Sequence, residues 1–158
     1  MTAVTVRFTL NGSPVEVEAG AGENLLTVLR RELGILSVRE TCGIGVCGTC
    51  TALVDGEPIS TCLLLAPLAE GTDVTTAEAL GDHPVARAFV DVHAFQCGFC
   101  TPGLVVTAAA FLRDTASPSD EEIRLALAGN LCRCGCYVKI LEAVRRAAAA
   151  EPDPRWPR

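Results

Sequence analysis

The sequence predicts an α+β protein in which a small mixed unit is followed by a helical unit. Apolar and polar residues alternate with a period of two in stretches of the first half, and this alternation disappears near Thr76. Beyond that point alanine, leucine and helix-boundary residues dominate. We therefore expect one domain over residues 1–76, a second over residues 77–150, and a flexible tail over residues 151–158, where three of eight residues are prolines.

In the first half, the pattern predicts strands on either side of one helix. Residues 4–10 and 15–18 alternate around an Asn-Gly-Ser-Pro turn, which indicates a hairpin. Residues 23–33 carry leucines at helical spacing, and a glycine follows where the helix would end. Residues 51–54 and 58–64 are strand-like and flank an Asp-Gly turn. A hairpin, a helix and returning strands are typical of a small α+β unit.

In the second half, helix-boundary residues predict four short helices. Prolines suit the first turn of helices that run from Pro84 toward Phe95 and from Pro102 toward Arg113. Ser119 or Asp120 suits the N-cap of a third helix, which ends before a Gly-Asn pair. A fourth helix is expected over residues 138–150. Four helices of this length predict a bundle.

Composition and charge argue against a role at nucleic acids or in membranes. The chain has 158 residues, 49% of them hydrophobic, and a formal charge of −6 without a recurring basic patch. The longest apolar run, residues 63–69, is interrupted by Pro67 and is too short to cross a bilayer. The first residues lack the pattern of a secretory signal, so we expect a cytoplasmic location, although a partner subunit could carry a signal for a whole complex.

The first half contains the cysteine-rich loop TCGIGVCGTCT at residues 41–51. Its cysteines have the spacing C-x4-C-x2-C and a fourth follows after eleven residues, which is the plant-type [2Fe–2S] spacing. The loop's glycines let backbone N–H groups approach a cluster that carries a charge of about −2. A structural zinc favours paired knuckles, and nine cysteines without a secretory signal disfavour disulfides. The candidate ligands are Cys42, Cys47, Cys50 and Cys62.

The second half carries CGFC at residues 97–100 and CRCGC at residues 132–136, each near an expected helix end. A CxxC pair and a CxC pair from two helix junctions can converge on one metal centre, and helix N-termini favour thiolate charge. By itself this pattern leaves open a zinc site, a second cluster or a redox CxxC pair. A second cluster beside the first would form an electron relay.

Three motifs in order resemble the iron–sulfur subunit of the molybdenum hydroxylases, the family of xanthine dehydrogenase, aldehyde oxidoreductase and carbon monoxide dehydrogenase. They are GIGVCGTCTALVDG at 43–56, QCGFCTPG at 96–103 and GNLCRC at 129–134. The resemblance covers residues 3–148. It implies a β-grasp ferredoxin-like domain and a four-helix-bundle domain, each with one [2Fe–2S] cluster. The implied ligands are Cys42, Cys47, Cys50 and Cys62 for the first cluster and Cys97, Cys100, Cys132 and Cys134 for the second.

The resemblance also implies that Gln96 and Cys134 lie close to the pterin of a molybdenum cofactor held by a large partner subunit. From its position alone, Gln96 would be a polar residue bonded to backbone at a helix end. The chain departs from the family pattern after GNLCRC, where a threonine or glycine pair commonly precedes the tyrosine and this chain has Gly135 and Cys136. This ninth thiol is either a buried bystander or a competitor of Cys132 or Cys134 as a ligand.

We therefore expect an electron-transfer subunit of a molybdenum-dependent oxidoreductase, without an active site of its own. It would form a hetero-oligomer with a large molybdopterin-binding subunit and an FAD-binding medium subunit, and would pass electrons from the molybdopterin to the flavin or another acceptor. Two alternatives are a free-standing carrier with two clusters and a zinc-stabilised adaptor. The substrate is not encoded here, because its pocket would lie in another polypeptide.

Overall fold

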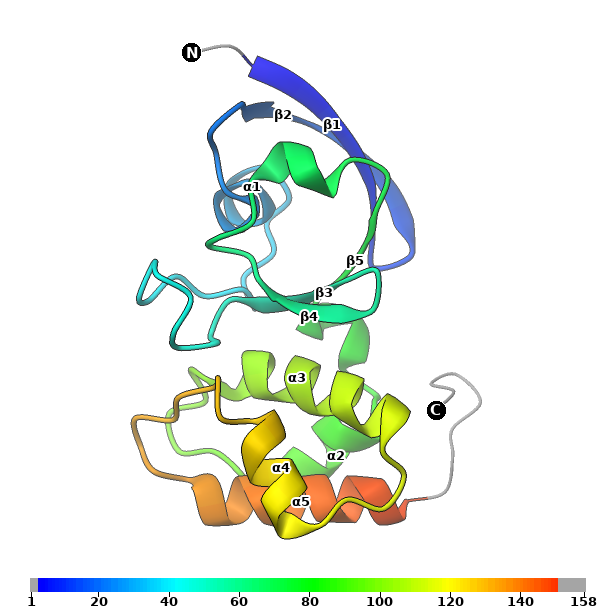
Figure 1. Cartoon of the computed structure of the whole chain (residues 1–158), viewed down its shortest axis with the longest axis vertical. Coiled ribbons are helices and arrows are strands. Elements are labelled where there is room, and N and C mark those ends of the chain that lie inside the picture. The colour runs from blue at the N-terminus through cyan, green and yellow to red at the C-terminus, as the bar shows by residue number, and fades with distance from the viewer. Residues whose placement is uncertain (1–2, 151–158) are drawn as a thin grey trace.

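The computed structural model describes residues 3–150 and consists of two halves stacked along its long axis (Figure 1). The N-terminal half contains a five-stranded sheet with strand order β2-β1-β5-β3-β4. Strands β1 and β5 are parallel, and the other neighbouring pairs are antiparallel. The strands are β1 (Ala3–Leu10), β2 (Ser13–Gly20), β3 (Thr51–Val54), β4 (Glu57–Ser60) and β5 (Asp73–Thr75), and the helix is α1 (Leu25–Arg31).

Helix α1 packs against the sheet in a β-grasp arrangement. Its N-cap is Asn24, whose side-chain oxygen accepts a hydrogen bond of 2.9 Å from the backbone N–H of Thr27. Leu25, Leu26 and Leu29 are almost fully buried and share one core with the inward-facing residues of the sheet. The α+β class and the β-grasp topology implied by the resemblance are confirmed.

The sequence pattern did not reveal β5, which has three residues and no alternation long enough to detect. This strand joins the two hairpins, because it pairs with β1 on one side and β3 on the other. The strand expected over residues 58–64 is also shorter, since β4 ends at Ser60. Cys62 therefore lies in the turn after the strand. Two 3-10 turns, Ala66–Ala69 and Ala77–Leu80, complete the connections.

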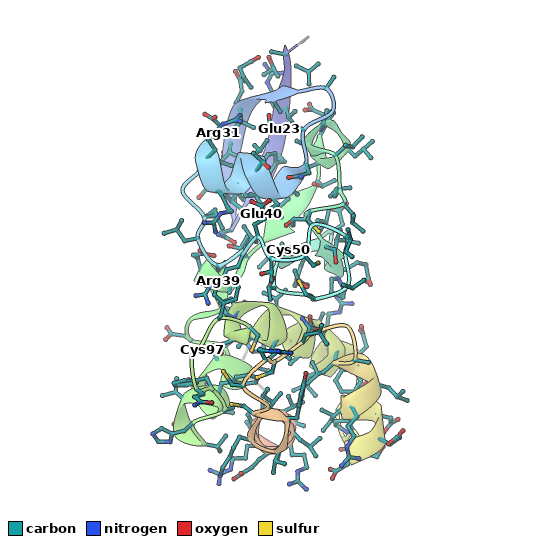
Figure 2. The ribbon with its side chains drawn as sticks, turned by 90° about the vertical axis from the view of Figure 1, so that its left-hand side faces the viewer. Glu23, Arg31, Arg39, Glu40, Cys50 and Cys97 are labelled. Carbon is teal, nitrogen blue, oxygen red and sulfur yellow. The ribbon has the colours of Figure 1, made fainter. Side chains whose placement is uncertain are left out.

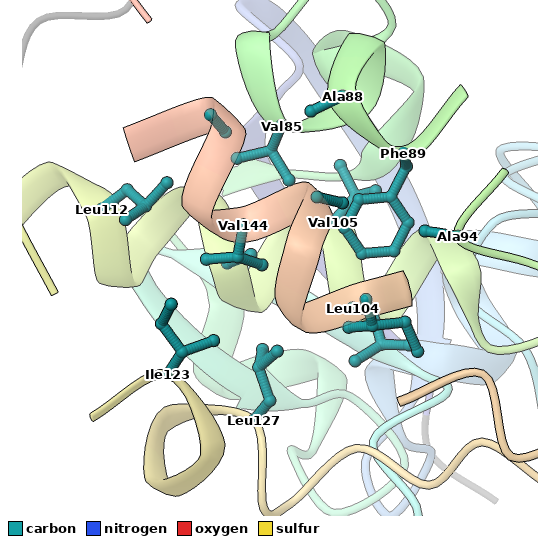
Figure 3. Packing of buried hydrophobic residues seen from close by; sticks show 14 of the residues in the cluster. Val85, Ala88, Phe89, Ala94, Leu104, Val105, Leu112, Ile123, Leu127 and Val144 are labelled. Atoms are coloured by element: carbon teal, nitrogen blue, oxygen red, sulfur yellow. The ribbon is translucent and has the colours of Figure 1, made fainter. Parts of the chain in front are cut away.

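The C-terminal half is a bundle of four helices, as the sequence predicts: α2 (Pro84–Asp91), α3 (Thr101–Asp114), α4 (Asp120–Ala126) and α5 (Tyr137–Ala149). Figure 3 shows Phe89, Leu104, Ile123 and Val144 converging from different helices on its core. Ser119 begins α4 through a reciprocal capping box with Glu122. Within residues 3–150, no helix combines the length and the apolarity that crossing a bilayer requires.

Helix α2 is shorter than the sequence predicts. It ends at Asp91, and His93 has a φ of 53°, so the chain leaves the helix before Phe95. His93 falls within the helix expected from Pro84 toward Phe95, but it lies in the segment that leads to the second cysteine group. This early end directs residues 92–100 back toward the sheet.

The two halves meet where α3 lies under β3 and β4 (Figure 1). Leu53 of β3 packs against the helical core, and Arg113 of α3 donates a hydrogen bond of 2.8 Å to the carbonyl oxygen of Gly56. The buried residues form two separate clusters, one in each half. The division into residues 1–76 and 77–150 stays a prediction, and the predicted tail, residues 151–158, lies outside the described residues.

Candidate metal centres

The four cysteines of the first half come together between the sheet and the helical bundle. Cys47, Cys50 and Cys62 are buried, and Cys42 is half-buried. The thiol of Cys42 contacts that of Cys47, and the thiol of Cys62 contacts that of Cys50. The loop of residues 41–51 therefore supplies three thiols that are joined by a fourth from the turn after β4.

Backbone N–H groups of this loop face its sulfur atoms. The N–H of Ile44, the thiol of Cys47 and the N–H groups of Val46 and Cys47 lower the pKa of Cys42 to about 6. Burial raises the pKa of Cys62 although the N–H of Gly45 favours its thiolate. Amides aimed at sulfur stabilise negative charge in a site that excludes most water, which is what an anionic cluster requires.

The second group has the same paired arrangement. The thiol of Cys97 contacts that of Cys134, and the thiol of Cys100 contacts that of Cys132. Burial opposes ionisation of Cys132, but the N–H of Cys136, the thiol of Cys100 and the N–H groups of Cys134 and Gly135 outweigh it and hold its pKa below the ordinary value. The CxxC and CxC pairs from the two helix junctions therefore converge, as the sequence predicts.

The donors fit a binuclear iron–sulfur cluster at each group. Each group offers two contacting pairs of thiols, which matches the two thiolates that each iron of such a cluster takes. A cavity of about 400 Å³ is lined by Cys97, Cys100 and Cys132. Thr101 follows Cys100 in the sequence, and its buried hydroxyl has no hydrogen-bond partner among the described residues. A buried hydroxyl next to a candidate ligand is a suitable donor to cluster sulfur.

One edge of the second group is open to solvent. Cys97 and Cys134 are exposed, as is the neighbouring Gln96, whereas Cys132 is buried. The residues expected near a pterin therefore lie at the surface, where a partner could reach them.

The ninth thiol, Cys136, lies at the N-cap of α5, and its partly buried side chain packs against the helical core. Its backbone N–H donates to the sulfur of Cys132 over 3.4 Å. The thiol of Cys136 also contacts that of Cys132. The backbone N–H of Cys136 therefore stabilises the sulfur of Cys132, whether or not the thiol of Cys136 binds a metal.

Backbone contacts join the two cysteine groups directly. The N–H of Leu131 donates to the carbonyl oxygen of Cys47 over 2.9 Å, and the buried side chain of Asn130 donates to the carbonyl oxygen of Gly48 over 3.0 Å. Gly48 has a φ of 66°, and a Cβ on it would lie 2.5 Å from the carbonyl oxygen of Gly129. The loop of the first cysteine group therefore packs closely against residues 129–131, which precede Cys132 of the second group.

Residue patterns alone did not reveal three of the contacts around these groups. Asn130 is part of the GNLCRC motif, but its pattern indicates only the end of a helix. Thr49 lies between two candidate ligands, and its hydroxyl is 3.2 Å from the sulfur of Cys47. Arg39 precedes the loop and reaches the carbonyl oxygen of Gly98 in the second group. Their positions beside cysteines are the signal that could have identified them.

Family models match both halves of the chain. Residues 8–80 match the model described as a 2Fe-2S iron-sulfur cluster binding domain. Residues 72–145 match a different model, described as a [2Fe-2S] binding domain. The matched residues include all eight candidate ligands.

Several curated proteins and solved structures are similar over nearly the whole chain. One subunit of the nicotinate dehydrogenase from Pseudomonas putida is 45% identical over 154 residues, which are 95% of this chain and 98% of that protein. The xanthine dehydrogenase iron-sulfur-binding subunit of Escherichia coli is 45% identical over 150 residues, which are 89% and 92% of the two chains. A chain of quinoline 2-oxidoreductase from Pseudomonas putida superposes with a TM-score of 0.89 at 38% identity, over 93% of this chain and 94% of that chain.

The approach of α3 to the first cysteine loop gives a testable prediction. A Cβ at Gly103 would lie 2.2 Å from the carbonyl oxygen of Gly48, and neither backbone can move without disturbing a cysteine group. We expect Gly103→Ala to reduce the free energy of unfolding by about 1–3 kcal/mol, as overpacking does. At Gly129 a Cβ meets nothing within 4 Å, so Gly129→Ala is the matched control. Equal thermal unfolding midpoints for Gly103→Ala and the unmodified chain would contradict the predicted close packing.

Proposed function

Because the chain belongs to the iron–sulfur subunits of the molybdenum hydroxylases and has two [2Fe–2S]-binding domains, we propose that it relays electrons from a molybdopterin site in a large partner subunit to an external acceptor. The observation that carries this proposal is the direct contact between the two cysteine groups, in which the N–H of Leu131 meets the carbonyl oxygen of Cys47. Two centres whose ligand-bearing segments are hydrogen-bonded to each other are suited to pass electrons between them.

We propose the two ligand sets that the family resemblance implies, and the contacts between their thiols support them. Within each set, two pairs of thiols contact each other. A [2Fe–2S] cluster takes four thiolates, two to each iron, and when bound it supplies one-electron chemistry. The proposed ligands are Cys42, Cys47, Cys50 and Cys62 for the first cluster and Cys97, Cys100, Cys132 and Cys134 for the second.

The chain's own residues hold and shield these centres. The amides of Ile44 and Val46 in the first group, and those of Gly135 and Cys136 in the second, stabilise sulfur charge. The burial of most of the first set and of Cys132 in the second keeps water away from the proposed clusters. The proposed role is therefore non-catalytic, since these residues bind and position redox centres and offer no group for substrate chemistry.

The open edge of the second group is the proposed approach for the molybdenum cofactor. Gln96 and Cys134 are both exposed there, and Cys134 contacts Cys97. A pterin held by a large subunit at this edge would contact a ligand of the second cluster directly. In this proposal, electrons enter the chain at the second cluster.

The first group has an apolar rim suited to a second partner. Ile44, Val46 and Leu63 are exposed by 67%, 56% and 60%. Ile44 and Val46 belong to the cysteine loop, and the side chain of Leu63 lies beside Gly45 of the same loop. We place the docking surface of an FAD-binding medium subunit, or of another acceptor, at this rim. The proposed complex is thus a hetero-oligomer. Its proposed location is the cytoplasm, which suits nine cysteines without a disulfide.

The metal content of the native complex tests this function. We expect the chain, tagged at its C-terminus and purified from its own host, to elute with a larger subunit and about four irons per molybdenum. The measurement is elemental analysis of the fractions from size-exclusion chromatography. Elution of the chain alone, with iron and without molybdenum, would instead identify a free-standing carrier.

A pair of serine variants tests the ligand assignment. We expect Cys134→Ser to disturb the second cluster, whereas Cys136→Ser should keep about four irons per chain, because the thiol of Cys136 packs with the helical core and its backbone N–H is unchanged. The measurement is the iron content and the paramagnetic resonance of each reduced variant. Retention of the second cluster's signal in Cys134→Ser together with its loss in Cys136→Ser would overturn the assignment.

A further inference from the structure

Arg39 belongs to the first half but places its charged group in the second cysteine group. Figure 2 shows it at the junction of the halves, above the segment that carries Cys97. Its side-chain Nη1 donates a hydrogen bond of 2.9 Å to the carbonyl oxygen of Gly98. Its guanidinium carbon lies 4.9 Å from the centroid of the Phe99 ring. Gly98 and Phe99 are the two residues between Cys97 and Cys100, so the charge lies against the CxxC segment.

The backbone of Arg39 is fixed to the first cysteine loop. Its N–H donates to the carbonyl oxygen of Thr49 over 3.1 Å, and the hydroxyl of Thr49 donates to the carbonyl oxygen of Arg39 over 2.9 Å. The same hydroxyl is 3.2 Å from the sulfur of Cys47. Arg39 thus links the two cysteine groups by a second route, independent of the contact between Leu131 and Cys47.

Arg39 forms no salt bridge with any of the described residues. Its side chain is half-buried, which weakens screening by water. A cation in this position stabilises the form of a neighbouring centre that carries the extra electron. The centre whose segment the guanidinium contacts is the one to which Cys97 and Cys100 belong.

We propose that Arg39 is a positioning residue that raises the reduction potential of the second cluster relative to the first, by holding a positive charge in the Cys97–Cys100 segment. This inference rests on the two clusters of the proposed function. Because the charge is anchored in the other half, its effect requires the two halves to be docked. The difference between the reduction potentials of the two clusters therefore depends on the contact that Arg39 makes between the two halves.

The test compares variants of Arg39 with a matched arginine. Arg113 also links the halves through a backbone carbonyl, that of Gly56, but it touches no cysteine group. The midpoint potentials of both clusters are measured in cluster-loaded full-length chain by redox titration followed with paramagnetic resonance, and Cys134→Ser identifies the signal of the second cluster. Thermal unfolding midpoints are recorded for each variant.

We expect Arg39→Gln to shift the reduction equilibrium of the second cluster about tenfold toward the oxidised form, or 59 mV for one electron, and that of the first cluster less. Arg39→Lys should recover most of this shift because it keeps the charge. Arg113→Gln should leave both midpoints in place, even if it lowers the unfolding midpoint. If Arg39→Gln keeps both signals and neither midpoint moves, or if Arg39→Lys shifts as far as Arg39→Gln, the inference is wrong. Absence of two clusters from the unmodified chain would instead refute the proposed function.

Discussion

The close approach of the two cysteine loops is the constraint on which the rest of the structure depends. The carbonyl oxygens of Cys47 and Gly48 each accept a hydrogen bond from the segment that precedes Cys132. Gly103 allows the first turn of α3 to touch the same loop. These contacts fix the orientation of the sheet on the bundle, because any side chain larger than hydrogen at these glycines would separate the loops. The proposed clusters are neighbours for that reason.

The thiolates of the two neighbouring cysteine groups carry negative charge, which nearby protein groups must stabilise. Backbone amides do this in both groups, where the N–H groups of Ile44 and Cys136 face candidate ligands. Amides carry no net charge, so they stabilise thiolate without attracting counter-ions into the junction. Arg39 is different because it brings a full charge to one group only. In our proposal Arg39 therefore shifts the redox balance between the two clusters, whereas backbone amides stabilise the sulfur charge within each group.

The sequence was sufficient for the α+β class, for the first hairpin and for the four helices, because alternation and helix-boundary residues are local signals. It also identified both cysteine groups, since their spacing is a covalent property of the chain. It missed β5, whose three residues are set by pairing with β1 and β3. Asn130 and Arg39 were missed as well, because each acts on a residue more than fifty positions away and no local pattern encodes such a contact.

The most direct test of this account is the content of iron and acid-labile sulfide in the purified chain. Two binuclear clusters predict about four irons and four sulfides per chain, bound by eight of the nine cysteines. Stoichiometric zinc without sulfide would contradict the account, because the paired thiols would then serve a structural metal.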